Sequence, residues 1–232
     1  MSSPAVEFPN YRPDLHSHST ASDGALAPAE LVLRAHNAGV SHLALTDHDT
    51  TAGIDEAQTA ARSLGITLIP GAELSVSWQG QTLHVVGLGL NTESEALKRF
   101  LKATRTLREA RAEAICGKLA KIGLEIDWRS IDTHSIGRGH IAQVLIERGW
   151  VRTHQQAFDH YLKRGRKGHV RVEWLSLEAG VAAIRAAGGI AVLAHPGVYR
   201  MTHSKMRRLL AAFRDAGGEG IEVITGAHGS PA

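Results

Sequence analysis

Cysteine is almost absent from this chain, since Cys116 is the only one among its 232 residues. A single cysteine excludes an intramolecular disulfide and any zinc finger built on several thiolates. No apolar run reaches the ~20 residues that a membrane-spanning helix needs. The N-terminal residues lack a basic stretch followed by an apolar core, which excludes a secretory signal. We therefore expect a cytoplasmic protein with no membrane partner.

Net charge is also small, at +3, with a pI of about 9.2. This mild basicity suits an anionic substrate but is too weak to predict binding to long DNA. Histidine, in contrast, is abundant, with 14 residues. A histidine-rich chain with one cysteine favours imidazole metal ligands or acid–base chemistry, although many of these residues will be ordinary surface histidines.

Strand and helix patterns alternate at both ends of the chain but not in its middle. Residues 10–96 and 168–232 show the alternation, whereas residues 97–167 carry helical patterns only. This predicts an α/β fold with a mainly parallel sheet, interrupted by a small α-helical insertion that caps the substrate. Strands are expected at 11–18, 40–46, 66–70, 74–78, 82–90, 190–194 and 220–224. Helices are expected at 28–38, 51–64, 94–121, 139–148, 154–163, 177–187 and 203–216.

The first group with chemical character is the pair His16 and His18, followed by Asp23. On a strand, residues two apart face the same side, so both imidazoles can point at one ion. Imidazole nitrogen suits zinc, manganese and iron, and Asp23 can return on the next loop. The alternative is a pair of histidines on a surface strand.

Two further groups follow predicted strands. His48, preceded by Asp47, comes after the strand at 40–46, and Glu73 comes after the strand at 66–70. Functional groups of parallel α/β folds gather at the carboxyl ends of strands. His48 is the expected ligand, while Asp47 is expected to orient a neighbour or cap a turn. Glu73 could bridge two metals, or could be a solvated glutamate.

His84 and His195 complete the set. His84 lies inside an apolar strand, where a buried imidazole needs a polar partner. It is therefore either a hydrogen-bonded core histidine or a metal ligand. His195 ends the strand at 190–194, and Pro196 keeps it extended. A structural zinc module gives no reason for ligands spread so widely along the chain. The order of these residues instead predicts a barrel that collects ligands for two or three divalent ions from successive strands.

These motifs resemble the polymerase-and-histidinol-phosphatase (PHP) family of phosphoesterases. The resemblance implies a distorted (β/α)7 barrel with two or three metals. It also implies one metal held by His16, His18 and Glu73, a second held by Glu73, His84 and His195, and a third near Asp23 and His48. The residues that carry it are Asp14–Ser19, Ser22–Gly24, Thr46–His48, Gly71–Glu73, His84 and Ala194–Pro196.

Within the insertion, Ile136–Ala142 and Phe158–Leu162 look like a subgroup that removes the 3′-phosphate from nucleoside 3′,5′-bisphosphates. Related members trim short RNA from its 5′ end. The resemblance implies that Arg138 and His140 reach the substrate's phosphate, and guanidinium does make paired hydrogen bonds to phosphate oxygens. The alternative for Arg138 is a helix-starting surface arginine. The basic run Lys163–Lys167 either adds positive charge at the rim of the substrate site or is an ordinary solvated charge run.

The resulting hypothesis is a metal-dependent phosphatase that converts pAp to AMP and phosphate and that also trims short RNA. The metals, with Mn²⁺ expected and Fe²⁺, Zn²⁺ or Mg²⁺ as alternatives, would activate water. Arg138 would offset charge on the attacked phosphate, and His195 would protonate the leaving group. The alternatives are another phosphomonoester, such as histidinol phosphate, and a non-catalytic PHP module that regulates a partner.

The chain departs from the family pattern at its end. The family closes with an Asp-x-His pair, and no such pair follows Glu222 in this sequence. His228 matches a family histidine with no assigned ligand role. We therefore expect either that the C-terminal end of the barrel is missing or that the metal sites are completed differently, with the third metal site the most affected.

Overall fold

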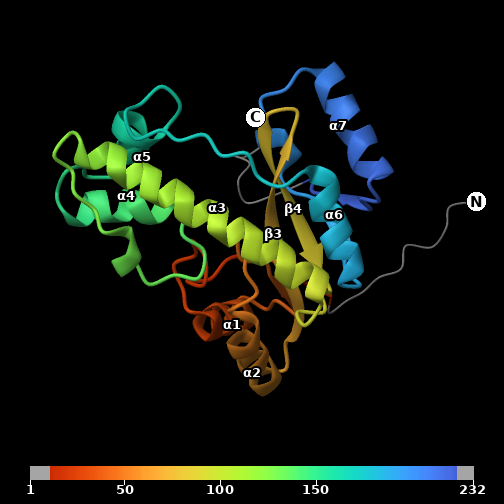
Figure 1. Ribbon diagram of the computed structural model, residues 1–232. Coiled ribbons are helices and arrows are strands. Elements are labelled where there is room, and N and C mark those ends of the chain that lie inside the picture. Colours follow the sequence, from red (N-terminus) through yellow and green to blue (C-terminus); the bar gives the residue numbers. More distant parts are fainter. Residues whose placement is uncertain (1–10, 224–232) are drawn as a thin grey trace, which may run out of the picture.

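The computed structural model describes residues 11–223, and its centre is one curled, six-stranded sheet (Figure 1). The strands follow the chain, in the order β1-β2-β3-β4-β5-β6. The prediction of an α/β fold is confirmed. The strands are β1 (Pro13–Ser17), β2 (His42–Leu45), β3 (Thr67–Trp78), β4 (Gln81–Leu88), β5 (Ile190–Leu193) and β6 (Gly220–Ile221).

Strand direction changes along the sheet. β1, β2 and β3 are parallel because helices connect them, and β5 and β6 are parallel for the same reason. β4 runs antiparallel to both β3 and β5. A two-residue turn joins β3 to β4, and both turn residues, Gln79 and Gly80, have positive φ (46° and 74°). Such turns match the twist of a hairpin.

The two strands expected at 66–70 and 74–78 are one continuous strand, β3. Its first part pairs with β2 and the rest pairs with β4, so each part finds a partner on a different side. Gly71 lies where the partners change, and a Cβ there would lie 2.8 Å from the Gly87 carbonyl oxygen. Close passage of this backbone therefore requires glycine at 71.

Seven α-helices lie within residues 11–223. The expected helix at 154–163 is a short α-helix followed by a π-helical turn, Phe158–Leu162. Short 3₁₀ turns occur at Trp128–Ser130 and Pro196–Val198. The α-helices are α1 (Pro28–Asn37), α2 (Ile54–Leu64), α3 (Glu95–Ala120), α4 (Arg138–Glu147), α5 (His154–Ala157), α6 (Leu177–Ala186) and α7 (His203–Asp215).

The long helix α3 belongs to two hydrophobic cores. Leu97 and Phe100, near its start, pack with β3, β4 and α6. Ile115 and Leu119, near its end, pack with α4 and the segment that follows it. In Figure 1 the helix crosses from α6 to the group of α4 and α5. The insertion thus has its own core, and its predicted boundary at residue 97 falls inside α3; the domain boundaries stay a prediction.

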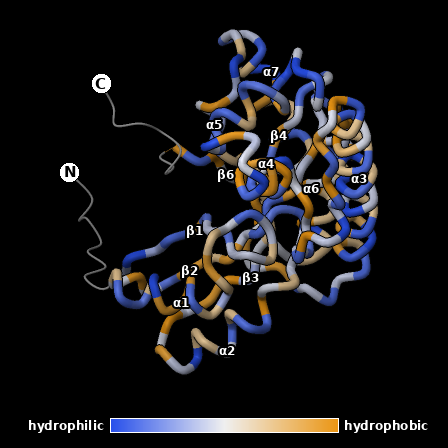
Figure 2. The backbone as a smooth tube through the Cα atoms, turned by 90° about the vertical axis from the view of Figure 1, so that its left-hand side faces the viewer, coloured by the Kyte–Doolittle hydropathy of each residue, from blue (hydrophilic) through white to orange (hydrophobic). Residues whose placement is uncertain are grey.

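The described residues form six strands where the family resemblance implies seven, and these strands make a half-barrel with edges at β1 and β6. Figure 2 shows these edges on the side of the molecule opposite α3. Ile224 and His228 lie outside the described residues. None of the helices within 11–223 combines the length and the apolar character needed to cross a membrane. The cytoplasmic location stays a prediction.

Candidate metal centre and substrate cleft

The predicted ligand side chains come from six different points of the chain and meet inside the curl of the sheet. His16 lies in β1 and His18 just after it, His48 follows β2, and His195 follows β5. Glu73 and His84 project from β3 and β4, respectively. Parallel strands present their carboxyl ends at the same edge, so residues far apart in sequence gather there.

Glu73 is the centre of this cluster. Its side chain is only 2% exposed, and five imidazole nitrogens lie close to its carboxylate. A carboxylate offers about four acceptor sites, so five imidazole nitrogens cannot all donate good hydrogen bonds to it at once. The nitrogen–oxygen distances are 3.2 Å for His16, 3.2 Å for His18, 3.1 Å for His48, 3.1 Å for His84 and 2.9 Å for His195.

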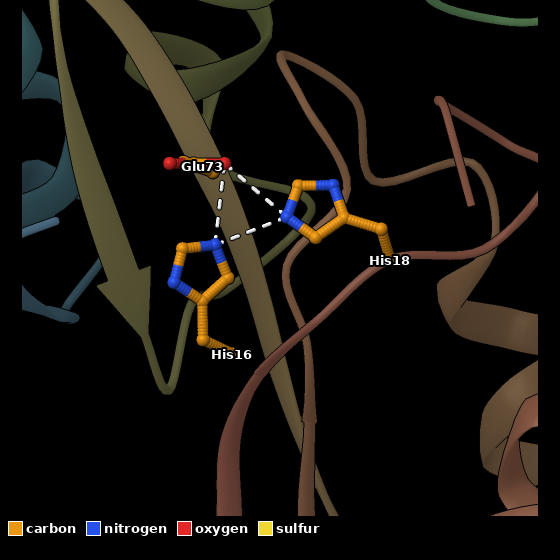
Figure 3. Close-up of side chains that lie close together, drawn as sticks. All are labelled: His16, His18 and Glu73. Atoms are coloured by element: carbon orange, nitrogen blue, oxygen red, sulfur yellow. Dashed lines mark hydrogen bonds and ion pairs between the residues drawn. The ribbon is translucent and has the colours of Figure 1, made fainter. Parts of the chain in front are cut away.

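Among residues 11–223, three sets of donor atoms are close enough to hold an ion each. In the first, His16, His18 and Glu73 point toward one another, as Figure 3 shows. The others share residues with the first; they are His18, Asp23 and His48, and His48, Glu73 and His84. All seven predicted metal-binding residues therefore come together, with His195 beside Glu73 and His84. Their division among individual metals stays a prediction.

The histidines of the cluster differ in the direction of their pKa shifts. Burial alone would lower the pKa of His16, but its hydrogen bonds to Glu222 and Glu73 raise it to about 10. His18 responds in the same way to Asp23 and Glu73, and its pKa rises to about 9. For His48 the effect of burial exceeds that of the nearby Glu73 charge, and the pKa of His48 falls to about 3. The surrounding imidazoles hold the pKa of Glu73 well below its usual range despite its burial.

This donor set fits divalent metal ions. Nδ1 of His48 is buried and lies 3.1 Å from the Glu73 carboxylate, yet it makes no well-directed hydrogen bond to any of the described residues. With its low pKa the ring keeps a free lone pair at neutral pH, which is the state that a metal requires. Mixed imidazole and carboxylate donors suit Mn²⁺, Fe²⁺ and Zn²⁺, and carboxylates also suit Mg²⁺.

Glu222 orients two of the histidines. One carboxylate oxygen lies 2.6 Å from Nδ1 of His16, and the other accepts a hydrogen bond from the backbone N–H of His195 (2.7 Å). The prediction that Pro196 keeps His195 extended is wrong: His195 has φ of 31° and ψ of 55°, in the left-handed region, and its backbone N–H bonds to Glu222 in that conformation. Sequence reasoning missed Glu222. Its place directly after β6, at a strand's carboxyl end, was the available signal.

Asp47 is buried and orients the loop that carries Asp23, as predicted. It accepts hydrogen bonds from the backbone and hydroxyl of Ser19 (both 2.7 Å) and from the hydroxyl of Ser22 (2.6 Å). Gly24 completes this tight loop, because a Cβ there would lie 2.2 Å from the His18 carbonyl oxygen. A carboxylate oxygen of Asp23 in turn lies 3.0 Å from Nδ1 of His18.

A cleft of about 730 Å³ runs from the cluster to the insertion. His48 and His84 lie along one part of it, and Arg111 and Arg138 along another. The guanidinium of Arg138 lies over the ring of Phe158 (5.3 Å), a contact of the cation–π type. Burial and the charges of neighbouring arginines lower the pKa of Arg111 to about 10. Its buried Nε has no hydrogen-bond partner in the described chain.

His140 lines the same cleft but is already bonded within the protein. Its Nδ1 accepts a hydrogen bond from the Gly137 N–H (2.9 Å), and its Nε2–H donates to the Ser22 carbonyl (2.7 Å). Binding a phosphate would break one of these bonds. In the structure the ring fastens the insertion to the Asp23 loop, and the phosphate contact of His140 stays a prediction.

A curled α/β sheet that gathers histidines and carboxylates around one buried glutamate, beside an arginine-lined cleft, defines a metal-dependent hydrolase for anionic substrates. The chain belongs to the PHP-domain family, whose pattern matches residues 14–176. It is therefore a phosphoesterase, as its resemblance to this family predicted.

Curated relatives narrow the class further. A 5′-3′ exoribonuclease of Haemophilus influenzae is 44% identical over 213 residues, which are 90% of this chain and 78% of that protein. A 3′,5′-nucleoside bisphosphate phosphatase of Chromobacterium violaceum is 42% identical over 221 residues, covering 93% and 77%. The structure of an amidohydrolase from C. violaceum superposes with a TM-score of 0.89 at 42% identity and covers 94% of this chain and 78% of its own.

Proposed function

We propose that this protein hydrolyses the 3′-phosphate ester of nucleoside 3′,5′-bisphosphates and, by breaking the same bond, removes the 5′ nucleotide of short RNA. One observation carries the proposal. A single cleft contains both the imidazole cluster and two arginines, Arg111 and Arg138, that are free of carboxylate partners within the described residues. Such a cleft suits a molecule with two phosphates better than one with a single phosphate. The names of the two curated relatives support the same chemistry.

The residues that would hold the metals are His16, His18, Asp23, His48, Glu73, His84 and His195. Bound divalent ions would supply Lewis-acid chemistry, lowering the pKa of water and polarising the phosphate. We infer Mn²⁺ as the preferred ion, because imidazole and carboxylate donors both suit it. Glu222 and Tyr199 hold ligand residues in position. The Tyr199 hydroxyl accepts a hydrogen bond from the His84 backbone N–H (2.8 Å).

His195 serves better as a ligand than as the predicted acid. Its Nε2 faces Glu73 at 2.9 Å, and a nitrogen that binds metal cannot also give a proton to a leaving group. Its Nδ1 is buried without a partner among the described residues and does not face the cluster's carboxylate. The departing ribose oxygen would then take its proton from solvent.

The test is phosphate release from adenosine 3′,5′-bisphosphate in the presence of Mn²⁺, with and without a chelator. We expect chelator-sensitive release that yields the 5′-monophosphate. Histidinol phosphate and adenosine 5′-monophosphate, assayed in parallel, should be poor substrates. Equal turnover of histidinol phosphate would point to the other phosphomonoester specificity, and binding of metal without turnover of any ester would point to a non-catalytic module.

Arg138→Ala should lower kcat/KM for the bisphosphate about 100-fold, mainly through KM, because a charge-assisted contact to the phosphate that is not attacked is lost. Hydrolysis of adenosine 3′-monophosphate should change little. Arg148→Ala, an exposed arginine that ends the same helix, is the matched control. A fall in kcat for both substrates would instead place Arg138 at the attacked phosphate, the catalytic role predicted from the sequence.

Metal affinity should rise with pH between 7 and 9. His16 and His18 have raised pKa values and hold protons in the metal-free protein, and metal binding must release them. Each released proton makes the Kd for Mn²⁺ fall roughly tenfold per pH unit. Titration calorimetry in two buffers of different ionisation enthalpy counts the protons. His203→Gln, at an exposed histidine of α7, should leave this dependence unchanged, whereas a flat pH profile of the wild type would contradict it.

A further inference from the structure

The loop of residues 19–24, which carries the predicted ligand Asp23, is held from two sides. On the side of the sheet, its hydroxyls and a backbone N–H bond to the buried carboxylate of Asp47. On the other side, two residues of the insertion, Thr133 and His140, reach its backbone carbonyls. The loop thus joins the sheet to the insertion, and both partners set the position of Asp23.

The Ser22 carbonyl receives most of the contact from the insertion. Nε2–H of His140 donates to it at 2.7 Å. The Thr133 hydroxyl lies 3.3 Å from the same oxygen and 3.4 Å from the Ala21 carbonyl oxygen. Ser22 is only 1% exposed. A buried carbonyl has little access to water and depends on donors from the protein, so loss of the His140 ring would leave Ser22 with the longer bond alone.

The orientation of the His140 ring is itself fixed. Its Nδ1 accepts a hydrogen bond from the Gly137 N–H (2.9 Å), so the ring proton is on Nε2 and faces Ser22. Gly137 directly precedes α4, His140 lies in its first turn, and both line the substrate cleft. One turn of helix therefore lines the cleft and also holds the loop that carries a metal ligand.

Asp23 depends on its backbone more than the other predicted ligands do. Its side chain is 46% exposed, against 2% for Glu73 and 17–25% for the five histidines of the cluster. One of its oxygens lies 3.0 Å from Nδ1 of His18, and the other lies 3.7 Å from Nε2 of His48. Because packing around the side chain is sparse, the loop backbone has to place this carboxylate.

We propose that His140 and Thr133 are positioning residues for the metal position that contains Asp23, so that the insertion sets the affinity of this position for its ion. The inference rests on the metal-binding part of the proposed function. The position is formed by the donor atoms of His18, Asp23 and His48. Neither His140 nor Thr133 belongs to the three donor sets found among residues 11–223, so both act through the loop backbone.

The test is titration of the metal-free protein with Mn²⁺, with the unbound ion followed by electron paramagnetic resonance. His140→Ala should raise the Kd of one bound ion about tenfold and leave the others within about twofold, because groups that orient a ligand typically change metal affinity 10–100-fold. Phosphate release from the bisphosphate should fall at limiting Mn²⁺ and recover in excess Mn²⁺, with KM for the nucleotide unchanged.

Thr133 supplies a milder pair of variants. Thr133→Val removes the longer hydrogen bonds and should weaken the same ion by a smaller factor. Thr133→Ser keeps the hydroxyl and should retain the wild-type affinity. His134→Ala, at an exposed histidine of the same segment, is the matched control and should bind every ion as the wild type does.

A second background separates positioning from a general loss of structure. Asp23→Ala should itself bind one ion fewer. Adding His140→Ala to this variant should leave the affinities of the remaining ions unchanged, because both substitutions act on the same metal position. Melting temperatures of the metal-free variants establish that they fold.

Unchanged affinity of His140→Ala for every ion would overturn the proposal, and a raised KM in that variant would assign the ring to the phosphate, as the family resemblance implies. Equal weakening of all ions, with and without Asp23, would also overturn it and make His140 a support of the fold alone. If His140→Ala does not fold, Thr133→Val decides, since unchanged affinities there contradict the inference. Absence of bisphosphate hydrolysis by the wild type would refute the proposed substrate and leave the Mn²⁺ titrations as a separate test.

Discussion

Replacing Glu73 by glutamine is expected to lower phosphate release more than 100-fold and to empty at least one metal position. Loss of a residue that only supports a ligand typically costs 10–100-fold, so loss of a shared ligand should cost more. The amide keeps the shape of the side chain but removes the charge around which five imidazole nitrogens gather at 2.9–3.2 Å. Metal content by mass spectrometry and phosphate release in excess Mn²⁺ measure the two effects.

Glu125→Gln is the matched control, because this glutamate is exposed and has no ion pair within the described residues. It should retain wild-type metal content and turnover. A Glu73→Gln variant that keeps both its metals and its activity would remove the basis for a metal centre at this cluster. Loss of activity with full metal content would place Glu73 at the substrate instead of at the ions.

Replacing Arg108 by methionine is expected to lower the free energy of unfolding by about 3–5 kcal/mol, because it leaves a buried carboxylate unpaired. Asp49 is fully buried, and two guanidinium nitrogens of Arg108 reach one of its oxygens at 2.6 and 2.7 Å. Asp49 also accepts a hydrogen bond from the Ser75 N–H (2.7 Å). Arg108 further donates to the Ile136 carbonyl (3.2 Å) and thereby joins α3 to the segment just before α4.

Urea denaturation measures this loss. Arg105→Met, on the same helix, removes an exposed pair with Glu109 and should cost less than about 1 kcal/mol. The double variant Arg108→Met/Asp49→Asn should recover part of the stability, because the uncompensated charge is gone. A single variant as stable as Arg105→Met would show that Asp49 gains enough solvent to stay charged without its partner. Asp49 follows His48 directly, so metal affinity should fall together with stability.

The arrangement of the ligands along the chain could be predicted because each signal is local. A histidine pair two residues apart on a strand, and single polar residues that directly follow apolar runs, indicate the carboxyl edge of a sheet. His16, His18, His48 and His195 were found in this way, and the structure places them together. The confirmed membership of the PHP family rests on the same motifs.

Strand boundaries around residue 70 could not be predicted from the same signals. Pro70 and Gly71 are typical of a turn, yet both lie inside β3, because β2 pairs with its first part and β4 with the rest. The π-helical turn at Phe158–Leu162 was equally hidden within a helical pattern. In both cases the partners that decide the local conformation are remote in sequence.

By itself the sequence determined the strand–helix alternation, the helical insertion and the set of candidate ligands, since these depend on patterns within a few residues. Which groups support the candidate ligands became clear only from the tertiary structure. His16 meets Glu222 across 206 residues, and Arg108 meets Asp49 across 59. His140, whose contact with the substrate stays a prediction, bonds to Ser22 across 118 residues. A side chain's role as ligand, anion site or internal bond depends on which buried charges and carbonyls lie beside it, and folding alone brings those neighbours together.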